Sequence, residues 1–234
     1  MLHTGFYRKS TAGHNTLTFN NDNVDNRNRG ASDQDPGVSG ITAIKLFEHG
    51  ATVKHQQGAP ASPAYAIVDL TAAYAKPFGT KRVERGFAFS AGFEQLVIVD
   101  EFELSSSSSS SNSSSSAPVV TNVTWTMHTL ADITIGDGRA SALLTMGGAE
   151  LHVKILQSKG VHDAFSSAKV DLKPPQNPTP AGFKKLMLHR PLQQDGHGSV
   201  ASVRRIVVVL SMNANTPIPP INPLEEWKQS GPFK

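Results

Sequence analysis

Short runs of apolar and β-branched residues, separated by turn-forming residues, dominate the chain. They predict strands over residues 41–48, 64–71, 82–90, 94–104, 119–129, 139–146, 151–157 and 199–212. The chain shows no helical periodicity that lasts eleven or more residues. Many short strands at this spacing favour an all-β fold, a large antiparallel sandwich of two sheets with little helix. The whole chain, 1–234, is expected to form a single domain.

Two of the predicted strands alternate between apolar and polar positions. Over 122–129 one face carries Val123, Trp125 and Met127, and the opposite face carries polar residues that end at His128. This pattern predicts one packed and one polar face, as in an antiparallel sheet. Over 94–104 the shared apolar face is Leu96, Ile98, Phe102 and Leu104. Asp100 interrupts that face, and because a buried charge needs a partner, a buried Asp–Arg pair is expected in these strands.

Other segments read as connections between strands. Gly147-Gly148 predicts a two-residue hairpin turn between 139–146 and 151–157. Residues 105–116 are serine except for Asn112, and this composition predicts a long disordered loop. Residues 213–234 form a proline-rich tail, whose four prolines between 216 and 223 exclude a central strand.

Composition excludes several functional classes. Lys plus Arg is 22 and Asp plus Glu is 19, and the resulting net charge of +3 is not gathered into a basic block. A nucleic-acid partner is therefore not expected. No apolar stretch of about 18 residues is present, so no membrane span is expected. The chain has no cysteine, which rules out disulfides and thiolate zinc fingers, and it begins without a signal-peptide pattern.

No short motif identifies a catalytic or metal site by itself. The nine histidines form no HExxH or HxH pair, and no Walker loop, dinucleotide fingerprint or GxSxG elbow is present. Gly13-His14-Asn15 stands out because His and Asn lie side by side before an apolar strand. Asn112 and Asn122 begin glycosylation sequons whose use the sequence does not decide.

Five segments, in order, resemble the C-terminal β-sandwich domain of heparinase II/III-like polysaccharide lyases. The first, YRKSTAGHNTL at 7–17, is similar to the segment that opens that domain. The others are AIVDLTAAY at 66–74, VERG at 83–86, LVIVDEF at 96–102 and VTWTMHT at 123–129. The resemblance covers roughly residues 5–160. Asp69, Tyr74, Arg85 and Asp100 fall in these motifs and are expected to belong to the structural pattern of the sandwich.

The resemblance implies an enzyme with two domains, an N-terminal α/α-toroid followed by this sandwich. The family cleaves acidic polysaccharides by β-elimination: a base removes the C5 proton of a uronic acid and an acid, often Tyr, protonates the departing O4. Many members hold Zn²⁺ in the sandwich. By position His14 matches the last zinc ligand, but its upstream partners have no counterpart here, so this chain is expected to bind no zinc. Tyr7 and His128 are the positions expected to contact substrate.

Two functions therefore stay open at this stage. The chain is either the sandwich domain of a lyase, inactive without its toroid, or a free-standing structural or carbohydrate-binding module without catalysis. A polymer substrate places a full-length parent outside the cell or in the cell envelope. The sequence of this chain leaves its own localisation, the identity of the polysaccharide and the oligomeric state undecided.

Overall fold

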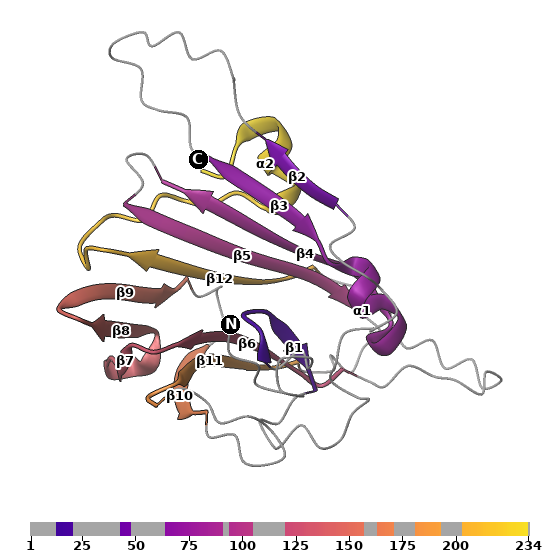
Figure 1. Cartoon of the computed structure of the whole chain (residues 1–234). Coiled ribbons are helices and arrows are strands. Elements are labelled where there is room, and N and C mark those ends of the chain that lie inside the picture. The colour runs from indigo at the N-terminus through magenta and orange to yellow at the C-terminus, as the bar shows by residue number, and fades with distance from the viewer. Residues whose placement is uncertain are drawn as a thin grey trace, which may run out of the picture.

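The structure is a computed structural model that describes residues 13–20, 43–47, 64–90, 94–104, 120–156, 163–170, 181–192 and 203–233. Two antiparallel sheets face each other (Figure 1). The four-stranded sheet has the order β1 (Leu17–Phe19), β6 (Asn122–Thr129), β11 (Lys184–Pro191) and β10 (Ala164–Lys169). The eight-stranded sheet has the order β2 (Ala43–Phe47), β3 (Tyr65–Asp69), β4 (Thr80–Phe89), β5 (Gln95–Leu104), β12 (Arg204–Ser211), β9 (Ala149–Ile155), β8 (Ser141–Met146) and β7 (Asp132–Ile135).

The predicted all-β sandwich is confirmed, and eight of the strands coincide with predicted runs to within a few residues. The Gly147-Gly148 hairpin is also confirmed: both glycines have positive φ, 60° and 82°, and Met146 pairs with Ala149 across the turn. Strands β7, β10 and β11 and the helices α1 (Thr71–Phe78) and α2 (Leu224–Ser230) were not predicted. The serine-rich segment lies outside the described residues.

The main core lies between the two sheets. Val123, Trp125 and Met127 of β6 point into it, as the alternation predicted. They belong to the same cluster as side chains of β4, β5 and β12 from the other sheet. Helix α1 closes one end: Phe19 of β1 makes edge-to-face contacts with Tyr74 and Phe78 of α1 and with Phe102 of β5, at centroid distances of 5.2, 5.3 and 5.4 Å. The Asp69 carboxylate accepts a hydrogen bond from the Thr71 N–H at 2.9 Å, so it satisfies one of the backbone donors that the first turn of α1 leaves without a helical partner.

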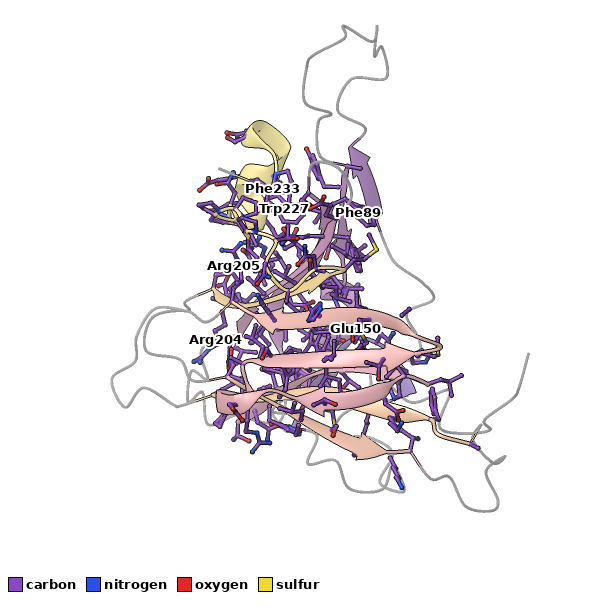
Figure 2. All side chains as sticks on the ribbon, turned by 90° about the vertical axis from the view of Figure 1, so that its left-hand side faces the viewer. Phe89, Glu150, Arg204, Arg205, Trp227 and Phe233 are labelled. Carbon is purple, nitrogen blue, oxygen red and sulfur yellow. The ribbon has the colours of Figure 1, made fainter. Side chains whose placement is uncertain are left out.

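A second core lies on the outer face of the eight-stranded sheet. Val97 and Val99 of β5, with neighbours on β3, β4 and β12, pack there against Leu224 and Trp227 of α2. Residues 216–233, which we call the C-terminal strap, carry these side chains across the sheet, and Figure 2 shows Trp227 beside Phe233. Within the strap, 216–220 form no strand, as the prolines predicted, but the segment is packed on the sheet.

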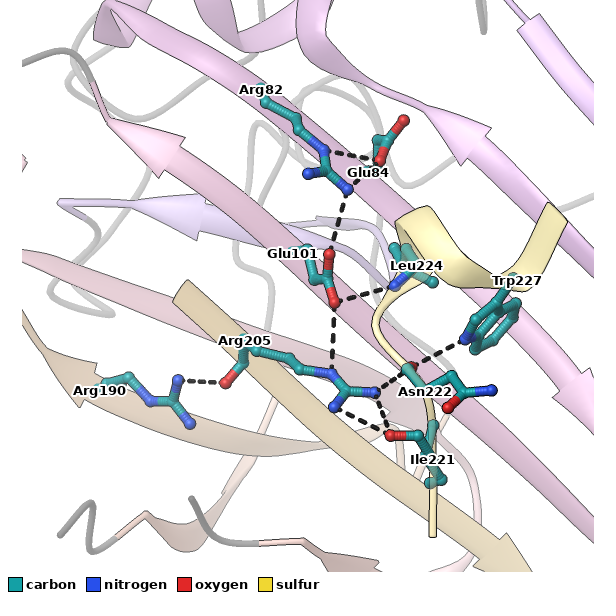
Figure 3. Close-up of polar contacts among 9 residues, drawn as sticks. All are labelled: Arg82, Glu84, Glu101, Arg190, Arg205, Ile221, Asn222, Leu224 and Trp227. Atoms are coloured by element: carbon teal, nitrogen blue, oxygen red, sulfur yellow. Dashed lines mark hydrogen bonds and ion pairs between the residues drawn. The ribbon is translucent and has the colours of Figure 1, made fainter. Parts of the chain in front are cut away.

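A polar network fastens the C-terminal strap to the sheet (Figure 3). Glu101 of β5, 2% exposed, accepts a hydrogen bond from the Leu224 N–H at 3.1 Å and pairs with Arg82 at 3.1 Å and Arg205 at 3.4 Å. Arg205 also donates to the Asn222 carbonyl at 2.6 Å. These contacts give the buried carboxylate the partners that a charge in this position needs.

The prediction for the polar face of β6 was only half right. Trp125 does face the core, but Thr124 and Thr126 on the opposite face are 1% and 5% exposed. The Thr124 hydroxyl lies 2.8 Å from His189 Nδ1 of β11, its directly opposite neighbour.

No helix among the described residues is long and apolar enough to span a membrane.

Candidate functional site at the end of the four-stranded sheet

The site is built around the loop that enters β1. Residues 13–16 run alongside the end of β6, where the Thr126 N–H donates to the Thr16 carbonyl at 3.2 Å. Tyr74 of α1 binds the same stretch of backbone. Its hydroxyl donates to the Leu17 carbonyl at 2.6 Å and lies 3.1 Å from Thr16 Oγ1. The loop is therefore attached both to its own sheet and to the helix that closes the sandwich.

A buried Asp–Arg pair was expected, and the structure forms it between Arg85 and Asp100, where it supports this loop. Nε and Nη2 of Arg85 donate to the two carboxylate oxygens of Asp100 at 2.7 and 2.9 Å, and the residues are 7% and 0% exposed. The remaining guanidinium nitrogen, Nη1, donates to the Asn15 carbonyl at 2.5 Å. Burial raises the pKa of the Asp100 carboxyl, and the adjacent guanidinium opposes that shift. The pair thus links the eight-stranded sheet to the loop on the other sheet.

Asn15 carries the connection one step further, to His128 at the end of β6. Its side-chain oxygen Oδ1 accepts a hydrogen bond from the His128 backbone N–H at 2.8 Å. The same oxygen lies 3.1 Å from Nδ1 of the His128 ring. Residues that are 113 positions apart in sequence are joined by these two contacts.

The His128 ring also has neighbours from β11 and the turn before it. The ring stacks on Phe183, with centroids 5.5 Å apart and planes inclined by 19°. Lys185 is directly opposite His128 in the register of β6 and β11, so the two side chains share one face of the sheet. We call Asn15, His128, Phe183 and Lys185 the imidazole cluster.

Electrostatics keep the cluster's imidazole neutral at physiological pH. Burial, and then the charges of Lys185 and His14, lower the pKa of His128 to about 4. Burial also lowers the pKa of the Lys185 ammonium. At neutral pH the cluster therefore combines one half-buried cation with one uncharged imidazole.

The low pKa of His128 predicts how the stability of the folded protein depends on pH. In the folded protein the His128 ring protons should titrate with a pKa of about 4, against about 6.5 in the unfolded chain. Because the unfolded chain takes up the proton first, stability should fall as the pH drops from about 6.5 towards 4. NMR of the ring protons measures the pKa, and unfolding of His128→Gln, which cannot titrate there, supplies the control. A His128 that titrates near 6.5 in the folded state would contradict the assignment.

The structure places only some of the positions expected from sequence at this site. His14 and His128 come close enough for the charge of one to shift the pKa of the other, although nothing in their spacing indicated it. Tyr7 lies outside the described residues. Phe183 and Lys185 were missed, because the run Leu186-Met187-Leu188 that marks β11 was not recognised as a strand.

Zinc is implied by the family resemblance, and His14 was its single expected ligand. A stable protein zinc site needs three or four ligands. In the part of the chain that the structure describes, no group of three or more His, Cys, Asp or Glu side chains could hold a metal ion. These residues therefore do not fit a zinc centre, and we assign no chemical step to the metal.

Comparison with known proteins now connects this geometry to a family. Residues 6–189 match the family described as heparinase II/III-like, C-terminal. A search of the curated proteins found no match. Two solved structures of the heparinase III-BT4657 gene product, one with methylated lysines, are similar, with TM-scores of 0.52 and 0.51 and sequence identities of 13% and 12%.

In both cases 88% of this chain is covered, but only 24% of the solved chain. The chain thus corresponds to about a quarter of those proteins, and at this identity the likeness shows the fold. The family match covers most of the chain and includes all five motifs, whose described residues meet around the ion pair and the imidazole cluster. This protein belongs to the heparinase II/III-like family and carries its C-terminal domain.

Proposed function

We propose that this chain is the sandwich domain of a polysaccharide lyase and that the imidazole cluster binds an acidic sugar unit of the polymer. The observation that carries the proposal is the half-buried Lys185 beside a neutral His128. A partly desolvated cation attracts a carboxylate more strongly than one in bulk water. The neutral ring beside it adds hydrogen-bonding capacity for sugar hydroxyl groups without adding charge.

Among the described residues, no tyrosine is placed to supply the acid that β-elimination requires. In the family the acid that protonates the leaving oxygen is often Tyr, and this chain has three tyrosines. Tyr65 and Tyr74 are 8% and 0% exposed, and their hydroxyls donate to the carbonyls of Trp227 and Leu17. Neither can reach a bound polymer, and Tyr7 lies outside the described residues. We therefore propose that cleavage depends on residues of the α/α-toroid and that this domain contributes binding.

The test has a binding arm and an activity arm. Lys185→Gln should weaken binding of a heparin or alginate oligosaccharide about tenfold, which corresponds to about 1.4 kcal/mol for a lost charge-assisted contact. Lys184→Gln is the matched control, because Lys184 points to the other face of the sheet and pairs with Asp132 at 2.5 Å. The purified chain should release no unsaturated product, which is detected by its ultraviolet absorbance. Equal binding by both variants, or product formation abolished by His14→Ala, would overturn the proposal.

A carbohydrate-binding module without catalysis is the second candidate, and the burial of Tyr65 and Tyr74 favours it. Both candidates expect the same binding result, but they differ in gene structure. An open reading frame upstream of Met1 that encodes several hundred toroid residues supports the lyase. Its absence, together with oligosaccharide binding, supports the free-standing module.

A further inference from the structure

We propose that Asn15 is a positioning residue, which holds the His128 imidazole in the tautomer with its proton on Nδ1 and Nε2 as the acceptor. The inference rests on the proposed function, because it assigns the group that presents His128 to a ligand. Its experiment reads the imidazole itself, so it stands or falls separately from sugar binding.

The hydrogen bonds of Asn15 determine the tautomer. The His128 backbone N–H can only donate, and it points at Oδ1 from 2.8 Å, which identifies that side-chain atom as the carbonyl oxygen. Nδ1 of the ring lies 3.1 Å from the same oxygen. An oxygen that accepts cannot donate, so Nδ1 must carry the proton of the neutral ring. Nε2 then has the lone pair and can accept a hydrogen bond from a hydroxyl group.

Asn15 can impose this choice because its own backbone is fixed. The Arg85 guanidinium donates to the Asn15 carbonyl at 2.5 Å and is itself held by both oxygens of Asp100. The next residue, Thr16, accepts from the Thr126 N–H of β6 and contacts Tyr74. A buried ion pair of the opposite sheet therefore sets the position of a half-exposed ring through one side-chain amide.

The ring orientation is restrained from a second direction. Phe183 stacks on the His128 ring with centroids 5.5 Å apart, so a rotation about the Cβ–Cγ bond would keep the stack but replace Nδ1 by a carbon atom facing Asn15. That rotation would leave the Asn15 oxygen with a single donor. The hydrogen bond and the stack together select one orientation and one tautomer. In a functional histidine, the hydrogen bond to one ring nitrogen usually sets the tautomer in this way.

Nitrogen-15 NMR of the histidine rings, recorded above neutral pH, tests the proposal. In the wild type, His128 Nδ1 should show the shift of a protonated nitrogen and Nε2 that of an unprotonated one. In Asn15→Ala the Nδ1 proton loses the acceptor that favours it, so the tautomer with the proton on Nε2 should become the major one. Asn15→Asp keeps an acceptor in place and should restore the wild-type pattern. His189, whose Nδ1 lies against Thr124, is the internal control and should not change in either variant.

Every outcome bears on the inference. An unchanged His128 tautomer in Asn15→Ala overturns it, as does a change that Asn15→Asp fails to reverse. If Asn15→Ala does not fold, Asn15→Ser gives the same reading, because its hydroxyl is too short to reach Nδ1. A reversed tautomer with unchanged oligosaccharide binding leaves the positioning role intact and contradicts the proposed function instead.

Discussion

Asp100→Ala should lower the free energy of unfolding by about 3–5 kcal/mol, because it leaves the Arg85 guanidinium buried without its counter-charge. Asp100 is 0% exposed and Arg85 makes both of its carboxylate contacts there. The loss should also loosen the loop at 13–16, since the guanidinium that holds the Asn15 carbonyl is no longer oriented. Urea unfolding measures the first effect, and hydrogen exchange of the loop amides measures the second.

Two further variants make this result interpretable. Asp132→Asn removes an exposed ion pair with Lys184 and should leave unfolding nearly unchanged. The double variant Arg85→Met, Asp100→Leu removes both charges and should regain much of the lost stability, since an apolar pair needs no counter-charge. An Asp100→Ala protein as stable as the Asp132→Asn protein would mean that water or another group compensates Arg85.

Trp227→Ala should cost a similar amount, about 3–5 kcal/mol, and should release the C-terminal strap. Trp227 is fully buried, contacts the Tyr65 ring edge-to-face at 5.8 Å, and donates from Nε1 to the Asn222 carbonyl at 2.9 Å. The rate of amide hydrogen exchange should increase over residues 216–233, while the amides of the core between the sheets stay protected. Uniform loss of protection over both cores would show that the two are not separable.

Gly86→Ala approaches the same contact from the sheet. A Cβ there would lie 2.3 Å from the Leu224 side chain and 2.8 Å from two atoms of the Trp227 ring. Such overpacking typically costs about 1–3 kcal/mol. If the strap is held by this contact, Gly86→Ala and Trp227→Ala should expose the same segment to exchange, and Glu225→Ala, at an exposed position of α2, should not.

Alternation along the chain was enough to predict the central strands. Residues 95–104 and 122–129 combine apolar runs with periodic polar positions, and both form strands. It was not enough for β10, whose sequence AFSSAK is too short and too small in its side chains to give a signal. Helix α1 spans eight residues, shorter than any window in which helical periodicity can be counted. Its stability comes from Tyr74 and Phe78, which insert into the core four residues apart.

The candidate site divides along similar lines. A buried Asp–Arg pair could be predicted because a charge in an apolar strand requires a partner, but the choice of Asp100 over Asp69 as the partner of Arg85 came only from the structure. The partner of His128 could not be predicted, because Asn15 reaches it across 113 residues through the fold. Lys185 was hidden by its place at the start of an unrecognised strand. The short helix α2 was not predicted within the proline-rich tail, because seven residues are too few to show helical periodicity.

The two tryptophans of this chain lie in different cores. Trp125 is 2% exposed between the sheets and tilts against Phe165, whereas Trp227 belongs to the C-terminal strap and is fully buried against the outer face of the eight-stranded sheet. Intrinsic fluorescence therefore has one emitter on each side of the eight-stranded sheet. A Trp125→Phe protein confines the emission to the strap, and a Trp227→Phe protein confines it to the space between the sheets. Detachment of the strap and opening of the sandwich thus become optically distinct events in a chain that needs no added label.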